Sequence, residues 1–250
     1  MRRSLVAAVA LVATAAGCGG DDDGGSGSEL VVSAAASLSN AFPDYADAAG
    51  YDAKFSFAGS DELAAQIRQG AAPDVYAAAN TTLPGDLYED ELLDKPVVFA
   101  TNRFLLAVPA DSSEIASLQD LTEPGVKIAI GDPQVPIGAY TRETLDKLPQ
   151  DQSKAILANV ASEEPDVLGI AAKINQGAVD AGFLYRSDVD ASNGKIKGIE
   201  LPADLEPDVA YGAGVVADAD EQDEAKSFVD GLLSDEGQRA LRENGFLLSP

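Results

Sequence analysis

The chain contains no histidine and a single cysteine, Cys18. Without histidine it cannot form Ser-His-Asp or Cys-His nucleophile systems, HExxH zinc sites or histidine proton shuttles. With one cysteine it cannot form a disulfide within the chain. No P-loop or GxGxxG motif follows an expected strand, and no pair of carboxylates stands out from the others. These absences exclude the common hydrolase and nucleotide-binding motifs, and leave an exported hydrolase that uses carboxylates alone as an alternative.

Basic residues are scarce. There are 17 lysines and arginines against 42 aspartates and glutamates, which gives a formal net charge of −25. Such a surface argues against nucleic acids and anionic lipids as partners. An anionic ligand would therefore have to be held by local groups and not by the overall charge.

Long apolar runs are also missing, apart from residues 5–16. This run follows Arg2 and Arg3 and has 12 residues, whereas a membrane-spanning helix needs about 20. A positive start, a short apolar segment and small residues before a cleavage site predict a signal peptide over residues 1–17.

The cysteine follows this segment directly. The sequence AAGC at residues 15–18 resembles a bacterial lipobox, so we expect cleavage before Cys18 and attachment of lipid to its thiol. The alternative is an ordinary cleaved signal with an unpaired cysteine. The following segment GGDDDGGSGS contains no apolar residue, and it predicts a flexible linker that, with Cys18, covers residues 18–28.

Beyond residue 28 the sequence alternates between strand and helix patterns, and 46% of the whole chain is hydrophobic, as in ordinary globular proteins. The expected strands cover residues 29–33, 53–57, 74–78, 102–108, 127–130, 159–161, 181–185, 196–200 and 209–216. The expected helices cover residues 38–49, 62–69, 138–147, 166–175, 221–233 and 236–243. This alternation predicts an α/β fold with mostly parallel sheets flanked by helices.

An ordered series of short motifs runs through this region. The motifs are AAASL at 34–38, FAGSDELAAQI at 57–67, GDPQVPIGAYTRETL at 131–145, EEPDV at 163–167 and GFLYRSD at 182–188. Each one starts an expected helix or ends an expected strand. At such positions backbone N–H groups are left free to hold an anion.

The series resembles the binding motifs of the molybdate-binding proteins that serve ABC transporters, and the resemblance covers nearly all of residues 29–250. It implies a two-lobed periplasmic-binding-protein fold of type II, with lobe 1 over 29–104 plus 206–250 and lobe 2 over 105–205. The ligand would lie in the cleft, and the lobes would close by a hinge motion. The resemblance also implies a monomer that is not an enzyme, needs no cofactor and passes its ligand to a membrane permease.

The same resemblance implies five ligand contacts. Ser37, Ser60 and Tyr185 would use their hydroxyl groups, whereas Ile137 and Val167 would use their backbone N–H groups. Each residue also has a simpler structural explanation: the serines could cap their own helices, and the other three could pack in the core. No side chain is expected to bind a metal ion directly.

Molybdate is a tetrahedral dianion without a proton, so a site made only of donors satisfies it. Tungstate is nearly the same size and should bind comparably, whereas hydrogen phosphate needs an acceptor for its own proton. Sulfate differs from molybdate only in size. A receptor for sulfate or another oxyanion therefore stays open, as do the carboxylate-based hydrolase and a surface adhesion module.

Overall fold

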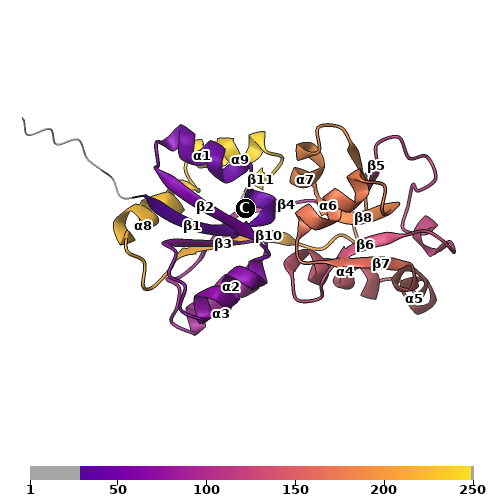
Figure 1. Ribbon diagram of the computed structural model, residues 1–250, viewed down its shortest axis with the longest axis horizontal. Coiled ribbons are helices and arrows are strands. Elements are labelled where there is room, and N and C mark those ends of the chain that lie inside the picture. The colour runs from indigo at the N-terminus through magenta and orange to yellow at the C-terminus, as the bar shows by residue number, and fades with distance from the viewer. Residues whose placement is uncertain (1–28, 249–250) are drawn as a thin grey trace, which may run out of the picture.

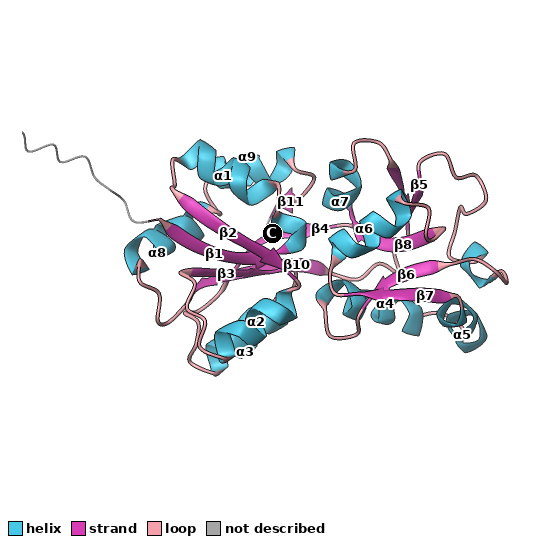
Figure 2. Cartoon of the chain, in the orientation of Figure 1, coloured by secondary structure: helices cyan, strands magenta, loops and turns pink. Residues whose placement is uncertain are grey.

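The computed structural model describes residues 29–248, which form two α/β lobes side by side (Figure 1). The predicted signal peptide, Cys18 and the linker lie outside the described residues. Among the described residues, no helix is long and apolar enough to cross a membrane. Each lobe is built on one sheet packed with helices (Figure 2), so the predicted two-lobed α/β architecture is confirmed.

The first lobe contains a six-stranded sheet with the strand order β11-β4-β10-β3-β1-β2. Its strands are β1 (Leu30–Ala35), β2 (Ala53–Ala58), β3 (Val75–Ala78), β4 (Val97–Asn102), β10 (Val209–Val215) and β11 (Leu247–Leu248). Its helices are the 3-10 turn η1 (Ala36–Leu38) and α1 (Ala41–Ala49), α2 (Ser60–Arg68), α3 (Thr82–Glu89), α8 (Gln222–Gly231) and α9 (Asp235–Glu243).

Strand β3 shows how this sheet divides the core. Successive side chains of a strand point to opposite faces. Tyr76 and Ala78 therefore pack in a small cluster with α2 and α3, while Val75 and Ala77 join the main core with α1 and α8. Because both faces of the sheet are covered, the central strand β3 is buried along its whole length.

The second lobe contains a five-stranded sheet with the order β7-β6-β8-β5-β9. Its strands are β5 (Phe104–Pro109), β6 (Ile128–Gly131), β7 (Val160–Glu164), β8 (Ala181–Tyr185) and β9 (Ile196–Glu200). Its helices are the 3-10 turn η2 (Asp120–Thr122) and α4 (Pro136–Asp146), α5 (Gln150–Ala158), α6 (Val167–Asn175) and α7 (Arg186–Ala191).

The chain passes between the lobes twice. Strand β4 ends at Asn102 and β5 begins at Phe104, and the second passage joins the end of β9 to the start of β10. The strands next to these passages are antiparallel to their neighbours in the sheet. Strand β10 is antiparallel to β3 and β4, and β5 is antiparallel to β8 and β9.

The expectation of mostly parallel sheets is wrong for this reason. Each sheet has two parallel strand pairs, β1 with β2 and β3 in the first lobe and β6 with β7 and β8 in the second. Antiparallel pairs number three in the first lobe and two in the second. Every antiparallel pair includes β4, β5 or β10, the strands at the two passages.

Several short elements differ from the sequence-based expectation. The sequence predicts one strand over 102–108, but Asn102 and Phe104 belong to strands of different sheets. Helices α3, α5 and α7 are absent from the expected elements. Helix α3 contains Pro84 in its first turn, where the missing N–H has no intrahelical partner to lose.

Candidate functional site

A small pocket lies between the lobes, where strand ends meet helix starts. The first lobe lines it with Ala35, Ala36, Ser37, Ala58, Gly59, Ser60 and Ala79, and the second lobe with Pro136, Ile137, Asp166, Val167 and Tyr185. The structure thus brings all five sequence-predicted contact residues into one pocket. Its volume is about 20 Å³, far below the roughly 300–1,000 Å³ of sites for drug-sized ligands. A pocket of this size suits a single small ion.

Four helix starts converge on the pocket. They belong to η1, α2, α4 and α6, whose flanking N-cap residues are Ala35, Gly59, Val135 and Asp166. The first N–H groups of a helix have no intrahelical acceptor, and they carry the positive end of the helix dipole. Within the described chain, the first three N-caps make no side-chain cap hydrogen bond. The N–H groups at these starts are therefore available to an anion.

The backbone comes close together at two glycines beside the pocket. A Cβ atom on Gly59 would lie 2.6 Å from the carbonyl oxygen of Pro165 in the other lobe. A Cβ atom on Gly138 would lie 1.8 Å from the carbonyl oxygen of Asp132. Glycine is therefore needed at Gly59 for the two lobes to meet at this distance, and at Gly138 for the first turn of α4 to lie against the loop after β6.

The two serines do not cap their helices in the expected way. Ser37 lies inside η1, and the N-cap of α1 is Asn40, whereas Ser60 is the first residue of α2. Both serines are buried. The Ser60 Oγ accepts a hydrogen bond from the Ala79 N–H at 3.1 Å, and the Ser37 Oγ lies 3.0 Å from the hydroxyl oxygen of Tyr211. The simpler reading of these serines as N-caps is therefore wrong.

Tyr185 ends β8 and contributes a buried hydroxyl group. Tyr185 is 1% exposed, and its hydroxyl has no hydrogen-bond partner among the described residues. Burial raises the pKa of this hydroxyl well above its ordinary value, so it stays protonated. A buried polar group without a partner costs free energy. The Tyr185 hydroxyl therefore has a donor available for a ligand in the pocket.

Ile137 and Val167 combine the two roles considered for them. Both side chains are buried in the main hydrophobic core. Both residues also stand in the first turn of their helices, directly after Pro136 and Asp166. The Asp166 carboxylate accepts a hydrogen bond from the Gly169 N–H at 2.9 Å, so this cap does not engage the Val167 N–H. The side chains stabilise the fold, and both residues also line the pocket.

No lysine or arginine is among the residues that line this pocket in the described chain. Arg186 follows Tyr185, but its side chain is about half exposed and lies 3.6 Å from Asp190. Arg103 pairs with Glu200 and Glu206. Positive potential in the pocket must therefore come from backbone and hydroxyl dipoles.

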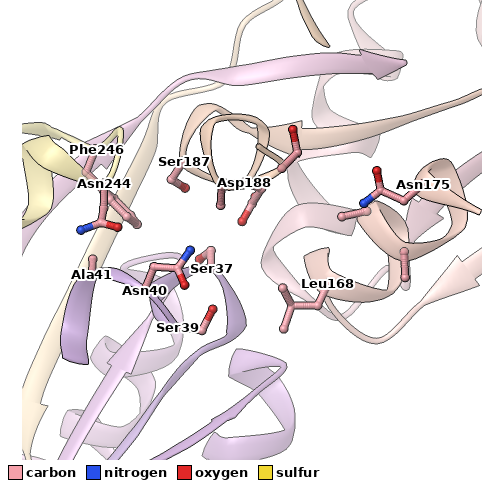
Figure 3. Close-up of a pocket in the computed structure, with 14 residues that line it drawn as sticks. Ser37, Ser39, Asn40, Ala41, Leu168, Asn175, Ser187, Asp188, Asn244 and Phe246 are labelled. Atoms are coloured by element: carbon pink, nitrogen blue, oxygen red, sulfur yellow. The ribbon is translucent and has the colours of Figure 1, made fainter. Parts of the chain in front are cut away.

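A second, larger cavity of about 260 Å³ opens beside the pocket and shares Ser37 with it. Figure 3 shows Ser37 and Asn40 on one side of this cavity, and Ser187 and Asp188 on the other. Burial raises the pKa of Asp188 to about 7, against the effect of the hydrogen bond that its carboxylate accepts from the Tyr185 N–H. Asp188 fixes the backbone at Tyr185, and the sequence analysis did not identify it.

Tyr211 is the other neighbour of the site that the sequence analysis missed. It lies in β10, is fully buried, and packs edge-on against Tyr185 with 5.9 Å between ring centroids. Each motif lies at a single strand-to-helix connection. Tyr211 lies in β10, and the second passage of the chain between the lobes brings it next to the site. A lone tyrosine in an extended segment carries no local signal of such a position.

Comparison with known proteins places the chain in a family. The family model described as bacterial extracellular solute-binding protein matches residues 30–247. The molybdate-binding protein ModA of Mycobacterium tuberculosis is 34% identical over 224 residues, which cover 87% of this chain and 84% of that protein. A Bacillus subtilis protein assigned as the ABC transporter substrate-binding lipoprotein YvgL is 31% identical, over 87% of this chain and 85% of its own.

A solved structure shows the same fold. The periplasmic molybdate-binding protein of Azotobacter vinelandii superimposes with a TM-score of 0.79 over 89% of this chain and 100% of its own, at 20% identity. The family model spans nearly all of the described residues, and relatives above 30% identity cover most of the chain. The chain therefore belongs to the bacterial extracellular solute-binding proteins, a family of exported binding proteins with this two-lobed α/β fold.

Proposed function

We propose that this protein binds molybdate in the pocket between the lobes, through neutral hydrogen-bond donors, and delivers it to the permease of an ABC transporter. The convergence of four helix starts and three hydroxyl-bearing residues on a pocket of about 20 Å³ carries the proposal. The name of the Mycobacterium tuberculosis relative supports the choice of ion. The donors are the hydroxyls of Ser37, Ser60 and Tyr185 and the amides of Ile137 and Val167.

Neutral donors are sufficient for this ligand. A hydrogen bond to a charged group contributes roughly 1.5–3 kcal/mol. Five such bonds sum to roughly 7.5–15 kcal/mol, and about 8 kcal/mol corresponds to a dissociation constant of 1 μM. In the upper part of this range the excess offsets the cost of ordering the ion and closing the lobes. No arginine or lysine is required, which agrees with the residues that line the pocket.

The proposed set of donors favours an oxyanion without a proton, and the one carboxylate that lines the pocket, Asp166, already accepts a hydrogen bond from the Gly169 N–H. Molybdate and tungstate accept hydrogen bonds on all four oxygens, whereas hydrogen phosphate carries a proton that needs an acceptor. Sulfate is also unprotonated and is smaller. In a rigid pocket it would leave longer and weaker hydrogen bonds to the same donors, so size is the property that separates it from molybdate.

Membrane attachment forms the last part of the proposal. We infer from the AAGC sequence at 15–18 that Cys18 carries lipid and that the linker holds the lobes near the outer face of the cytoplasmic membrane. Cys18 lies outside the described residues. The assignment of the Bacillus subtilis relative as a lipoprotein supports this arrangement.

Isothermal titration calorimetry tests the ligand. We expect molybdate and tungstate to bind with similar affinity, and sulfate and phosphate to bind at least about tenfold more weakly, a difference of about 1.4 kcal/mol. Molybdate at 100 times its dissociation constant should also stabilise the folded protein by about 2.7 kcal/mol in a thermal unfolding experiment. Equal affinities for sulfate and molybdate would contradict the assignment.

Three substitutions test the contact residues. We expect Ser37→Ala, Ser60→Ala and Tyr185→Phe each to weaken molybdate binding by roughly 1.5–3 kcal/mol, because each removes one hydrogen bond to a charged ligand. Tyr51→Phe is the matched control, since its hydroxyl bonds Ser227 at 3.0 Å, outside the pocket. If all three variants bind like the control, these residues do not form the site.

A further substitution tests the anchor. We expect Cys18→Ser to prevent labelling of the protein by a radioactive fatty acid in bacterial cells and to release it from the membrane fraction. The parent chain should carry the label. Absence of label from the parent chain would show that the protein has an ordinary cleaved signal.

A further inference from the structure

A chain of hydrogen bonds begins at the first passage between the lobes and ends at Ser37. The Arg103 N–H donates to the Oδ1 atom of Asn102 at 2.9 Å. A backbone N–H can only donate, so this bond fixes which end of the Asn102 amide faces Arg103. The amide nitrogen of Asn102 then faces the opposite way and donates to the Ser187 Oγ at 2.9 Å. Asn102 is 5% exposed, which leaves little room for another orientation.

The same amide also acts on the hydroxyl of Tyr211, which lies on the neighbouring strand. Strands β4 and β10 are paired, with Asn102 opposite Val209. Burial raises the pKa of the Tyr211 hydroxyl well above its ordinary value, and hydrogen bonds with Ser37 and Asn102 act in the opposite direction. The hydroxyl therefore keeps its proton, and it has two polar neighbours.

Only one of these neighbours can accept the Tyr211 proton. Asn102 presents its NH₂ group, which has no acceptor capacity. The Ser37 Oγ, at 3.0 Å, can accept. An unpaired buried donor is costly, so Tyr211 donates to Ser37. The Ser37 Oγ accepts a hydrogen bond from the Tyr211 hydroxyl. The Ser37 hydroxyl proton is therefore free to donate a hydrogen bond into the pocket.

Ser60 is fixed in a comparable way by a simpler contact. Its Oγ accepts a hydrogen bond from the Ala79 N–H at 3.1 Å, and Ala79 also lines the pocket. Both serine hydroxyls thus accept a hydrogen bond from another group of the protein. Both therefore have their own hydroxyl proton available to donate to a ligand. Free serine hydroxyls could donate or accept, so an arrangement of this kind changes which ligands the site can hold.

We infer that Asn102 and Tyr211 are positioning residues, which orient the Ser37 proton into the pocket and so select oxyanions that carry no proton of their own. The inference rests on the proposed function, because it assigns a direction to one of the proposed donors. Neither residue lines the pocket. The hydrogen-bond route from these residues to the pocket passes through the Ser37 hydroxyl.

Asn102→Asp tests the direction of this chain. A carboxylate has nearly the same shape and keeps the bond from the Arg103 N–H, but it accepts where the amide donated. The Tyr211 hydroxyl would then donate a hydrogen bond to the carboxylate at position 102 and accept one from the Ser37 hydroxyl. Ser37 would then present a lone pair, and not a proton, to the ligand. We expect the ratio of molybdate to phosphate affinity, measured by calorimetry at about pH 8, to fall about tenfold. At that pH phosphate is mainly a monoprotonated dianion, so the added charge affects both ligands alike.

Three comparisons separate this effect from a structural one. The ratio of molybdate to sulfate affinity should change less than about twofold, because neither anion carries a proton. In a Tyr211→Phe background, Asn102→Asp should leave the molybdate-to-phosphate ratio unchanged, because the connection to Ser37 is broken. Asn175→Asp adds the same charge at the wall of the larger cavity and should also leave that ratio unchanged.

The outcomes distinguish the two proposals. A parent protein that binds none of these anions overturns the proposed function and this inference with it. A parent that binds molybdate, together with an Asn102→Asp variant that keeps the parental ratio, overturns the inference alone. An equal fall in the Tyr211→Phe background also overturns it. If Asn102→Asp does not fold, Asn102→Ser replaces it: its hydroxyl can donate or accept, so the ratio should fall by about threefold, and an unchanged ratio overturns the inference.

Discussion

The site depends on helix starts whose N–H groups are left open. Ala35, Gly59 and Val135 stand where serine, threonine or aspartate would ordinarily cap a helix, and they make no side-chain cap bond. An uncapped helix start that faces water lowers the stability of the protein only slightly. Several such starts around one small pocket place unpaired N–H groups and the positive ends of helix dipoles together, which favours binding of an anion. This arrangement is how a protein with a net charge of −25 would hold the proposed anion, since no lysine or arginine among the described residues lines the pocket.

The rest of the structure keeps these helix starts together. Two passages of the chain join the lobes, and their strands β4 and β10 pair with each other in the first sheet. Asn102 bonds Ser187 across the lobes, and Tyr211 packs against Tyr185 from the opposite lobe. At Gly59 the backbone of one lobe approaches Pro165 of the other. The groups that join the lobes thus lie beside the residues that line the pocket.

The sequence predicts the local parts of this structure better than the long-range ones. Ser37, Ser60, Ile137, Val167 and Tyr185 each lie at a strand-to-helix connection, where a motif of a few residues marks the position, and the structure gathers all five. The mixed sheets, the separation of β4 from β5 at Arg103 and the place of Tyr211 follow from how the chain passes between lobes. No local pattern encodes that passage. Ser37 shows the same limit, because its partner Tyr211 is 174 residues away in the chain.

A crystal structure of the protein with molybdate, phased on the anomalous signal of molybdenum, would locate the ion. The account predicts one molybdenum peak in the pocket between the helix starts, with oxygens about 2.7–3.2 Å from the amides of Ile137 and Val167 and from the hydroxyls of Ser37, Ser60 and Tyr185. It also predicts no direct bond from a protein atom to the metal. A peak in the larger cavity beside Asp188, or a protein ligand on molybdenum itself, would contradict the account.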